Sequence, residues 1–147
     1  MRKDSSRSRG EVGIQRWRAA QRWRRSVERE LNAVDLTLTR WLVLEATEAC
    51  TRESADAVRQ REISQRAELD PMTVSQVMHS LEKRSWVDRG PSASGLAYRV
   101  LITARGKNVL GEGRARIEAA SQPSGVSLPK LSSARSTRPR SSGSSSP

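Results

Sequence analysis

Apolar residues recur along the first quarter of the chain at the spacing of one face of a helix. They are separated mostly by three or four positions, and arginines fill much of the space between them: Ile14, Trp17, Trp23, Val27, Leu31 and Val34. This period predicts an amphipathic helix over residues 14–34. A second helix is predicted to begin after Thr37, whose hydroxyl suits an N-cap, and its wide apolar surface predicts that much of it is buried.

Two shorter helices are predicted after residues 50–60, which lack helical periodicity and are predicted to form a loop. The first covers residues 60–69 and the second residues 71–86. Asp70 and Pro71 supply the N-cap and first-position signals that mark the start of the second helix. The pattern then changes at residue 87.

Residues 87–103 have an extended start, a tip rich in Gly, Pro and Ser, and a final segment rich in β-branched residues. This order predicts a β-hairpin. A last helix is predicted over residues 104–120, although Gly106, Gly111 and Gly113 each weaken it by about 1 kcal/mol relative to alanine. The predicted fold class is therefore mainly α with a small β-hairpin.

The chain is strongly basic, and much of its charge lies at its two ends. It has 147 residues, of which 27 are basic and 16 acidic, giving a formal charge of +11. Residues 1–10 hold four basic residues and one acid, and residues 121–147 hold four basic residues, eleven serines and no acid. Such segments bury too little apolar surface to offset the entropy of ordering. We predict a basic disordered arm over residues 1–12, one domain over residues 13–120 and a disordered Ser/Arg-rich tail over residues 121–147.

The composition excludes several classes of protein. Positive charge favours a polyanionic partner, but no segment approaches the roughly 20 apolar residues that span a bilayer, and no secretory signal is visible. A single cysteine, Cys50, fits a reducing cytoplasm and is predicted to be inert because Arg52 is the only nearby cation. His79, the only histidine, lacks partners at metal-ligand spacing. With no catalytic set or phosphate-binding loop, we predict neither an enzyme nor a metal or cofactor site.

Apolar spacing across residues 63–77 is that of a helix-turn-helix. Five side chains are spaced to fill the wedge between two short helices: Ile63, Ala67, Leu69, Val74 and Val77. On the second helix an apolar stripe formed by Val74, Val77, Met78 and Leu81 leaves Met72 and several polar side chains on the opposite side. A helix that enters a major groove needs a polar face with few carboxylates, and the hairpin that follows adds a wing.

This arrangement predicts two sets of DNA contacts. The base-contact candidates lie on the exposed side of residues 71–86: Thr73, Ser75, Gln76 and His79. The phosphate-contact candidates are cations on the two helices and at the base of the wing: Arg61, Arg66, Lys83, Arg84, Arg89 and Arg99.

Three stretches resemble the MarR family of bacterial transcription regulators: "DLTLTRWLVLEAT", "REISQRAELDPMTVSQVMHSLEKRSWVDRG" and "RVLITARG". The resemblance covers about residues 14–115 and is strongest over residues 62–89. It implies a winged helix-turn-helix protein that binds double-stranded DNA as a homodimer and acts as a repressor, and many members are released from DNA by a small-molecule effector.

The chain departs from the family pattern at several positions. Ser94 and Leu96 stand near the wing positions where the family usually carries a minor-groove arginine. Glu68 replaces the usual glycine of the inter-helix turn, and Gln76 stands where arginine is common. The long C-terminal helices of the family dimer are replaced by a glycine-containing helix and the serine-rich tail, so a dimer would depend on the Trp-rich first helix and residues 104–120.

Other interpretations stay open. The missing wing arginine favours a protein-interaction module that no longer reads DNA, and the basic ends favour a non-specific nucleic-acid binder. The first helix also fits a membrane surface or RNA, although Trp17 and Trp23 are more typical of packing in a core or a dimer interface.

Overall fold

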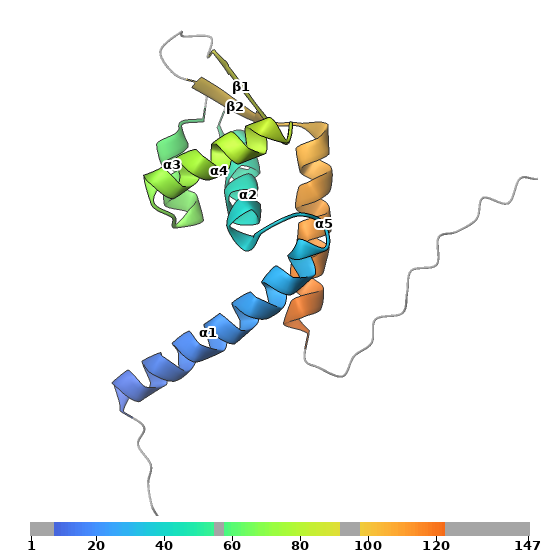
Figure 1. Cartoon of the computed structure of the whole chain (residues 1–147). Helices are drawn as coiled ribbons and strands as arrows, with labels where there is room; N and C mark the ends of the chain where they lie inside the picture. The colour runs from blue at the N-terminus through green and yellow to red at the C-terminus, as the bar shows by residue number, and fades with distance from the viewer. Residues whose placement is uncertain (1–7, 55–57, 92–97, 123–147) are drawn as a thin grey trace, which may run out of the picture.

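The computed structural model describes residues 8–54, 58–91 and 98–122. These residues form five helices and a two-stranded hairpin, which confirms the predicted fold class (Figure 1). The elements are α1 Arg9–Asn32, α2 Leu38–Glu53, α3 Gln60–Ala67, α4 Pro71–Lys83, β1 Val87–Pro91, β2 Tyr98–Ile102 and α5 Ala104–Ser121. None of the helices in the described ranges is long and apolar enough to cross a membrane.

α2 lies at the centre of the domain, and its N-cap is Thr37, as predicted. It contacts α1, α3, α4, α5 and β2, and Val43, Leu44 and Ala46 are fully buried (Figure 1). Thr47 is also fully buried, and its hydroxyl donates a hydrogen bond to the carbonyl of Val43 at 2.7 Å. A buried hydroxyl without a hydrogen-bond partner destabilises a fold, so this bond is what allows the polar side chain of Thr47 to lie in the core.

α3 and α4 form the predicted helix-turn-helix. Ile63 and Val74 are fully buried, and the other three wedge residues are partly buried against the same core: Ala67, Leu69 and Val77. Asp70 caps α4 by accepting a hydrogen bond from the backbone N–H of Thr73 at 2.8 Å. The start of α4 was therefore predictable from its capping residues.

α1, α3 and α4 are each followed, within three residues, by a residue with a left-handed backbone that is not glycine. The φ angles are 56° at Asp35, 53° at Glu68 and 57° at Ser85. Each is followed by an apolar residue whose N–H bonds to the carbonyl five positions earlier: Leu36, Leu69 and Trp86. This is the Schellman motif, which stops the helix and turns the next side chain toward the core.

These turns correct three predicted helix ends. α1 ends at Asn32 instead of residue 34, α3 at Ala67 instead of residue 69, and α4 at Lys83 instead of residue 86. Trp86, which was predicted to be the last residue of the helix over residues 71–86, lies beyond the end of α4 and is only 5% exposed.

α1 begins earlier, and α2 ends later, than predicted. Ser8 accepts a hydrogen bond from the N–H of Glu11 at 3.2 Å, so residues 9–12 are helical instead of part of a disordered arm. α2 continues to Glu53, into the predicted loop, and the Thr51 hydroxyl donates to the carbonyl of Thr47 at 2.7 Å within the helix. Ser121 is the last residue of α5 and Gln122 is its C-cap, so the predicted tail begins as the end of a helix. Residues 1–7 of the predicted arm and 123–147 of the predicted tail lie outside the described residues.

β1 and β2 form the predicted hairpin. They pair antiparallel, with Val87 opposite Ile102 and Pro91 opposite Tyr98. Val87 and Val100 are buried, which fixes the base of the wing to the domain. The tip, residues 92–97, which includes Ser94 and Leu96, lies outside the described residues.

α5 forms over its predicted length because two of its three glycines lie where neighbouring elements touch its backbone. A Cβ at Gly106 would overlap the carbonyl oxygen of Trp86, and one at Gly113 would overlap the ring of Trp41, whereas Gly111 has nothing within 4 Å. The indole N–H of Trp41 also donates to the carbonyl of Leu110 at 3.0 Å. Two glycines that the sequence marks as weak points are thus required for packing.

We expect Gly113→Ala to lower the free energy of unfolding by about 1–2 kcal/mol, because the overlap with Trp41 outweighs the gain of at most about 1 kcal/mol in helix propensity. Gly111→Ala is the matched control and should raise the free energy of unfolding by up to about 1 kcal/mol. Urea unfolding followed by circular dichroism measures both. Equal effects of the two substitutions would contradict the packing role of Gly113.

Candidate nucleic-acid interface

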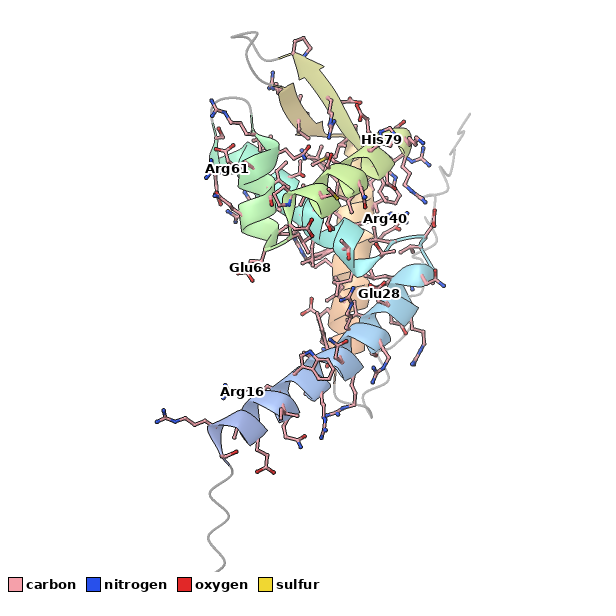
Figure 2. All side chains as sticks on the ribbon, turned by 60° about the vertical axis from the view of Figure 1, so that its left-hand side comes forward. Arg16, Glu28, Arg40, Arg61, Glu68 and His79 are labelled. Carbon is pink, nitrogen blue, oxygen red and sulfur yellow. The ribbon has the colours of Figure 1, made fainter. Side chains whose placement is uncertain are left out.

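α4 carries one continuous exposed face. Its exposed side chains follow positions i, i+3, i+4, i+7 and i+11: Met72, Ser75, Gln76, His79 and Lys83. Val74, Met78 and Leu81 are fully buried on the opposite side. Figure 2 shows His79 on the outer side of α4, facing away from the core. Three of the four predicted base-contact residues therefore share one face.

Thr73, the fourth base-contact candidate, is engaged at the start of the helix. Its hydroxyl donates to Oδ2 of Asp70 at 2.5 Å, and its backbone N–H donates to Oδ1 at 2.8 Å. These hydrogen bonds hold the pKa of the Asp70 carboxyl below its usual value. Thr73 is thus a partner of the helix cap, and its side chain is only partly exposed.

Three of the six predicted phosphate-contact cations are exposed and unpaired. Arg61, Lys83 and Arg99 form no ion pair or side-chain hydrogen bond with other residues in the described ranges. Figure 2 shows Arg61 projecting from α3 on the outside of the domain. These side chains are available to a polyanion.

The other three cations are already paired with carboxylates. Arg66 Nη1 lies 2.9 Å from Glu53 Oε2, and Arg84 pairs with Asp35. The Arg84 guanidinium also lies 5.1 Å from the centre of the Trp86 ring. Its hydrogen bond and charge hold the pKa of the Asp35 carboxyl below the usual value. These two arginines connect elements of the fold as well as adding positive charge.

The two arginines at the base of the wing lie on opposite faces of the hairpin. Arg89 is paired with Val100 in the register, and directly opposed residues share a face. Since Val100 is buried, Arg89 faces the domain, where its Nη2 donates to Gln60 Oε1 at 3.1 Å and its Nε lies 3.8 Å from Glu82. Arg99 is one residue earlier in β2 and therefore points to the other face.

A basic hollow beside the C-terminal end of α4 was not predicted. Its volume is about 420 Å³, and its lining includes Arg105, which was not among the predicted phosphate-contact residues. Arg40, on α2, acts electrostatically on Asp35 in the same region, and Figure 2 labels it near the start of α2. The long-range contacts that gather these residues leave no signal in local sequence patterns.

The apolar side of α1 is largely exposed in the first half of the helix. Trp17 is 63% exposed and Ile14 53%, so of the two kinds of packing predicted for Trp17, the core of this chain is the one that the structure contradicts. Trp23 is 41% exposed, and its indole N–H donates to Ser121 Oγ at 2.8 Å. The first half of α1 extends away from the rest of the domain (Figure 1). Packing in a dimer interface stays a prediction, as do the alternatives of a membrane surface or RNA.

Neither a metal site nor a reactive thiol emerges from the described part of the chain. No group of three or more His, Cys, Asp or Glu side chains there is placed to hold a metal ion. Burial raises the pKa of the Cys50 thiol, which disfavours the nucleophilic thiolate.

The sequence matches no model of a known protein family, and no curated protein matches it. Solved structures do match. CouR from Rhodococcus jostii RHA1, bound to p-coumaroyl-CoA, is 24% identical over 75% of each chain, with a TM-score of 0.63. A MarR-family transcriptional regulator from Rhodococcus sp. RHA1 is 23% identical over 79% of each chain, with a TM-score of 0.65.

A MarR-family protein from Mycobacterium tuberculosis, in complex with DNA, is 22% identical. The match covers 74% of this chain and 78% of that one, with a TM-score of 0.59. These likenesses confirm the fold that the resemblance implied: the chain has the winged helix-turn-helix fold of MarR-family regulators.

Proposed function

We propose that the chain is a DNA-binding transcription regulator of MarR type that reads the major groove with α4. The observation that carries this proposal is the exposed polar face of α4, where Ser75, Gln76 and His79 stand together on the second helix of a helix-turn-helix. The complex of a similarly folded protein with DNA supports it. A protein of this kind needs no catalytic residues, and it acts in the cytoplasm, where bacterial DNA lies.

Each proposed contact has a distinct role. The amide of Gln76 can pair with an adenine through two hydrogen bonds, which is worth about 1–3 kcal/mol of discrimination. Ser75 and His79 lie about one turn apart on the same face and contribute single hydrogen bonds. Thr73 contributes chiefly by holding the helix start, because its hydroxyl is bound to Asp70.

Backbone phosphates are the proposed partners of the cations around α4. Arg61, Lys83 and Arg99 are unpaired within the described residues and contact phosphates directly. The paired cations, Arg66, Arg84 and Arg89, contact DNA only by exchanging a carboxylate for a phosphate.

A homodimer would give two copies of α4 a fixed spacing. Half-sites one helical turn apart require the two reading helices to lie about 34–36 Å apart. Occupation of a promoter by such a dimer would repress transcription. The complex of CouR with p-coumaroyl-CoA supports an organic small molecule as the class of effector.

Whether α4 reads bases is tested by comparing two binding affinities. One is for a DNA site selected from a random library, and the other is for a non-specific duplex. We expect Gln76→Ala to weaken binding to the selected site by about 1–3 kcal/mol while leaving the non-specific duplex nearly unaffected. Arg61→Gln should weaken binding to both and reduce the slope of log K against log salt by about one. Fluorescence anisotropy over a range of salt concentrations measures these effects.

The outcome also separates the regulator from its alternatives. If the wild-type protein retains no duplex at low salt, the fold is an interaction module and the proposed function is wrong. If it binds but selects no sequence, the protein is a non-specific nucleic-acid binder. If it selects a sequence but Gln76→Ala weakens binding to both duplexes equally, Gln76 does not read bases and the proposed role of this residue is wrong.

Ile14 and Trp17 form an exposed apolar stripe on α1, and a substitution in this stripe tests the proposed dimer. We expect Trp17→Glu to convert a dimer into a monomer in sedimentation velocity, because it places a charge where Ile14 and Trp17 would be buried. Arg22→Gln changes the net charge by the same amount and lies about 140° around the helix from Trp17, so it should leave the dimer intact. Identical sedimentation of wild type and Trp17→Glu would exclude this stripe as the interface.

A further inference from the structure

The hollow beside the C-terminal end of α4 is surrounded by positive charge. Lys83 and Arg84 close α4, and Arg105 lies in the first turn of α5. Asp35, from the turn between α1 and α2, is the only acid among the lining residues. The complete lining is Val34, Asp35, Lys83, Arg84, Ser85, Trp86, Arg105 and Val109. Three cations and one carboxylate leave the hollow with a net charge of +2.

The backbone contacts that form the hollow hold its cations in place. The N–H of Thr103 donates to the carbonyl of Trp86 at 3.0 Å, and the Thr103 hydroxyl donates to the carbonyl of Ser85 at 2.8 Å. Gly106 allows the first turn of α5 to lie directly against Trp86. Arg105 is therefore carried by a helix turn that is fixed to the end of the reading helix.

Only one of the three cations is neutralised. Arg84 pairs with Asp35 and stacks over Trp86, whereas Lys83 and Arg105 are exposed and make no ion pair with any residue of the described ranges. Lys83 is also the last residue of the exposed line that runs through Gln76 and His79. The hollow is thus continuous with the face that is proposed to read bases.

We propose that this hollow binds a phosphate of the DNA backbone, with Arg105 as a contact that supplements α4 and the wing. The inference rests on the proposed function. A strand whose bases contact Gln76 and His79 would continue past Lys83, so that a phosphate reaches Arg84 and Arg105. In the free protein the Asp35 carboxylate is paired with the Arg84 guanidinium. The incoming phosphate replaces the carboxylate in this pair. Two guanidinium groups and an ammonium group suit an oxyanion of this charge.

Arg105→Gln tests the proposal against a matched substitution on the same helix. Arg114 is exposed, forms no ion pair with another described residue, and lies nine positions later, about 180° around α5. We expect Arg105→Gln to weaken binding to selected and random duplexes by roughly three- to tenfold and to reduce the salt slope by about one. Arg114→Gln should change affinity by less than about twofold. Thermal melts of both variants check that the fold is retained.

Asp35→Asn provides a test in the opposite direction. Asparagine tolerates the left-handed backbone of this turn, so the substitution removes the charge and keeps the conformation. Because Arg84 is then free, DNA affinity should rise roughly threefold or more and the salt slope should steepen. Glu118→Gln, an exposed acid near the other end of α5, makes the same change of charge outside the hollow and should have a smaller effect.

Three outcomes would overturn the inference. If wild type binds DNA but Arg105→Gln and Arg114→Gln weaken it equally, the hollow makes no specific contact and only this inference fails. If Arg105→Gln weakens calorimetric binding of pyrophosphate but leaves DNA affinity unchanged, the hollow is a site for free anions instead of DNA. If wild type binds no duplex, the proposed function and this inference fail together.

Discussion

The carbonyl of Trp86 is the point at which α4, the wing and α5 are joined. It accepts hydrogen bonds from the N–H and the hydroxyl of Thr103, at 3.0 and 3.2 Å, and the missing side chain of Gly106 permits this approach. The Trp86 side chain is buried, so the junction is anchored in the core. Since α4 ends, β1 begins and β2 passes into α5 around this one residue, their relative orientation depends on it.

Charge at the proposed interface is controlled by pairing as well as by the number of arginines. Arg66, Arg84 and Arg89 each face a carboxylate from a different element, so each contributes to the fold and has reduced attraction for phosphates. Exposed ion pairs of this kind contribute little to stability, because water and salt screen them. Their larger effect is orientation: they hold long side chains in place around α4, while the unpaired cations supply the direct attraction.

Local signals in the sequence were sufficient for most of the fold but not for its junctions. Thr37 and Asp70 mark helix starts because capping depends on neighbouring residues, and the polar face of α4 follows from periodicity alone. The ends of α1, α3 and α4 were predicted two or three residues too late, because Asp35, Glu68 and Ser85 stand at the left-handed position that usually carries glycine. The start of α1 was missed despite the Ser8–Glu11 pair, which is a capping signal. The basic hollow was inaccessible to sequence reasoning because Arg84 and Asp35 are 49 positions apart.

The Asp35–Arg84 pair also connects the proposed dimer helix to the proposed reading helix. An exposed helical segment as short as the first half of α1 is marginal alone in water, so packing of Ile14 and Trp17 against a second copy would stabilise it. α1 then enters the core through Val27 and Leu31 and ends at the turn that carries Asp35. Because Asp35 pairs with Arg84 at the end of α4, the turn that ends α1 and the basic hollow are joined through this contact.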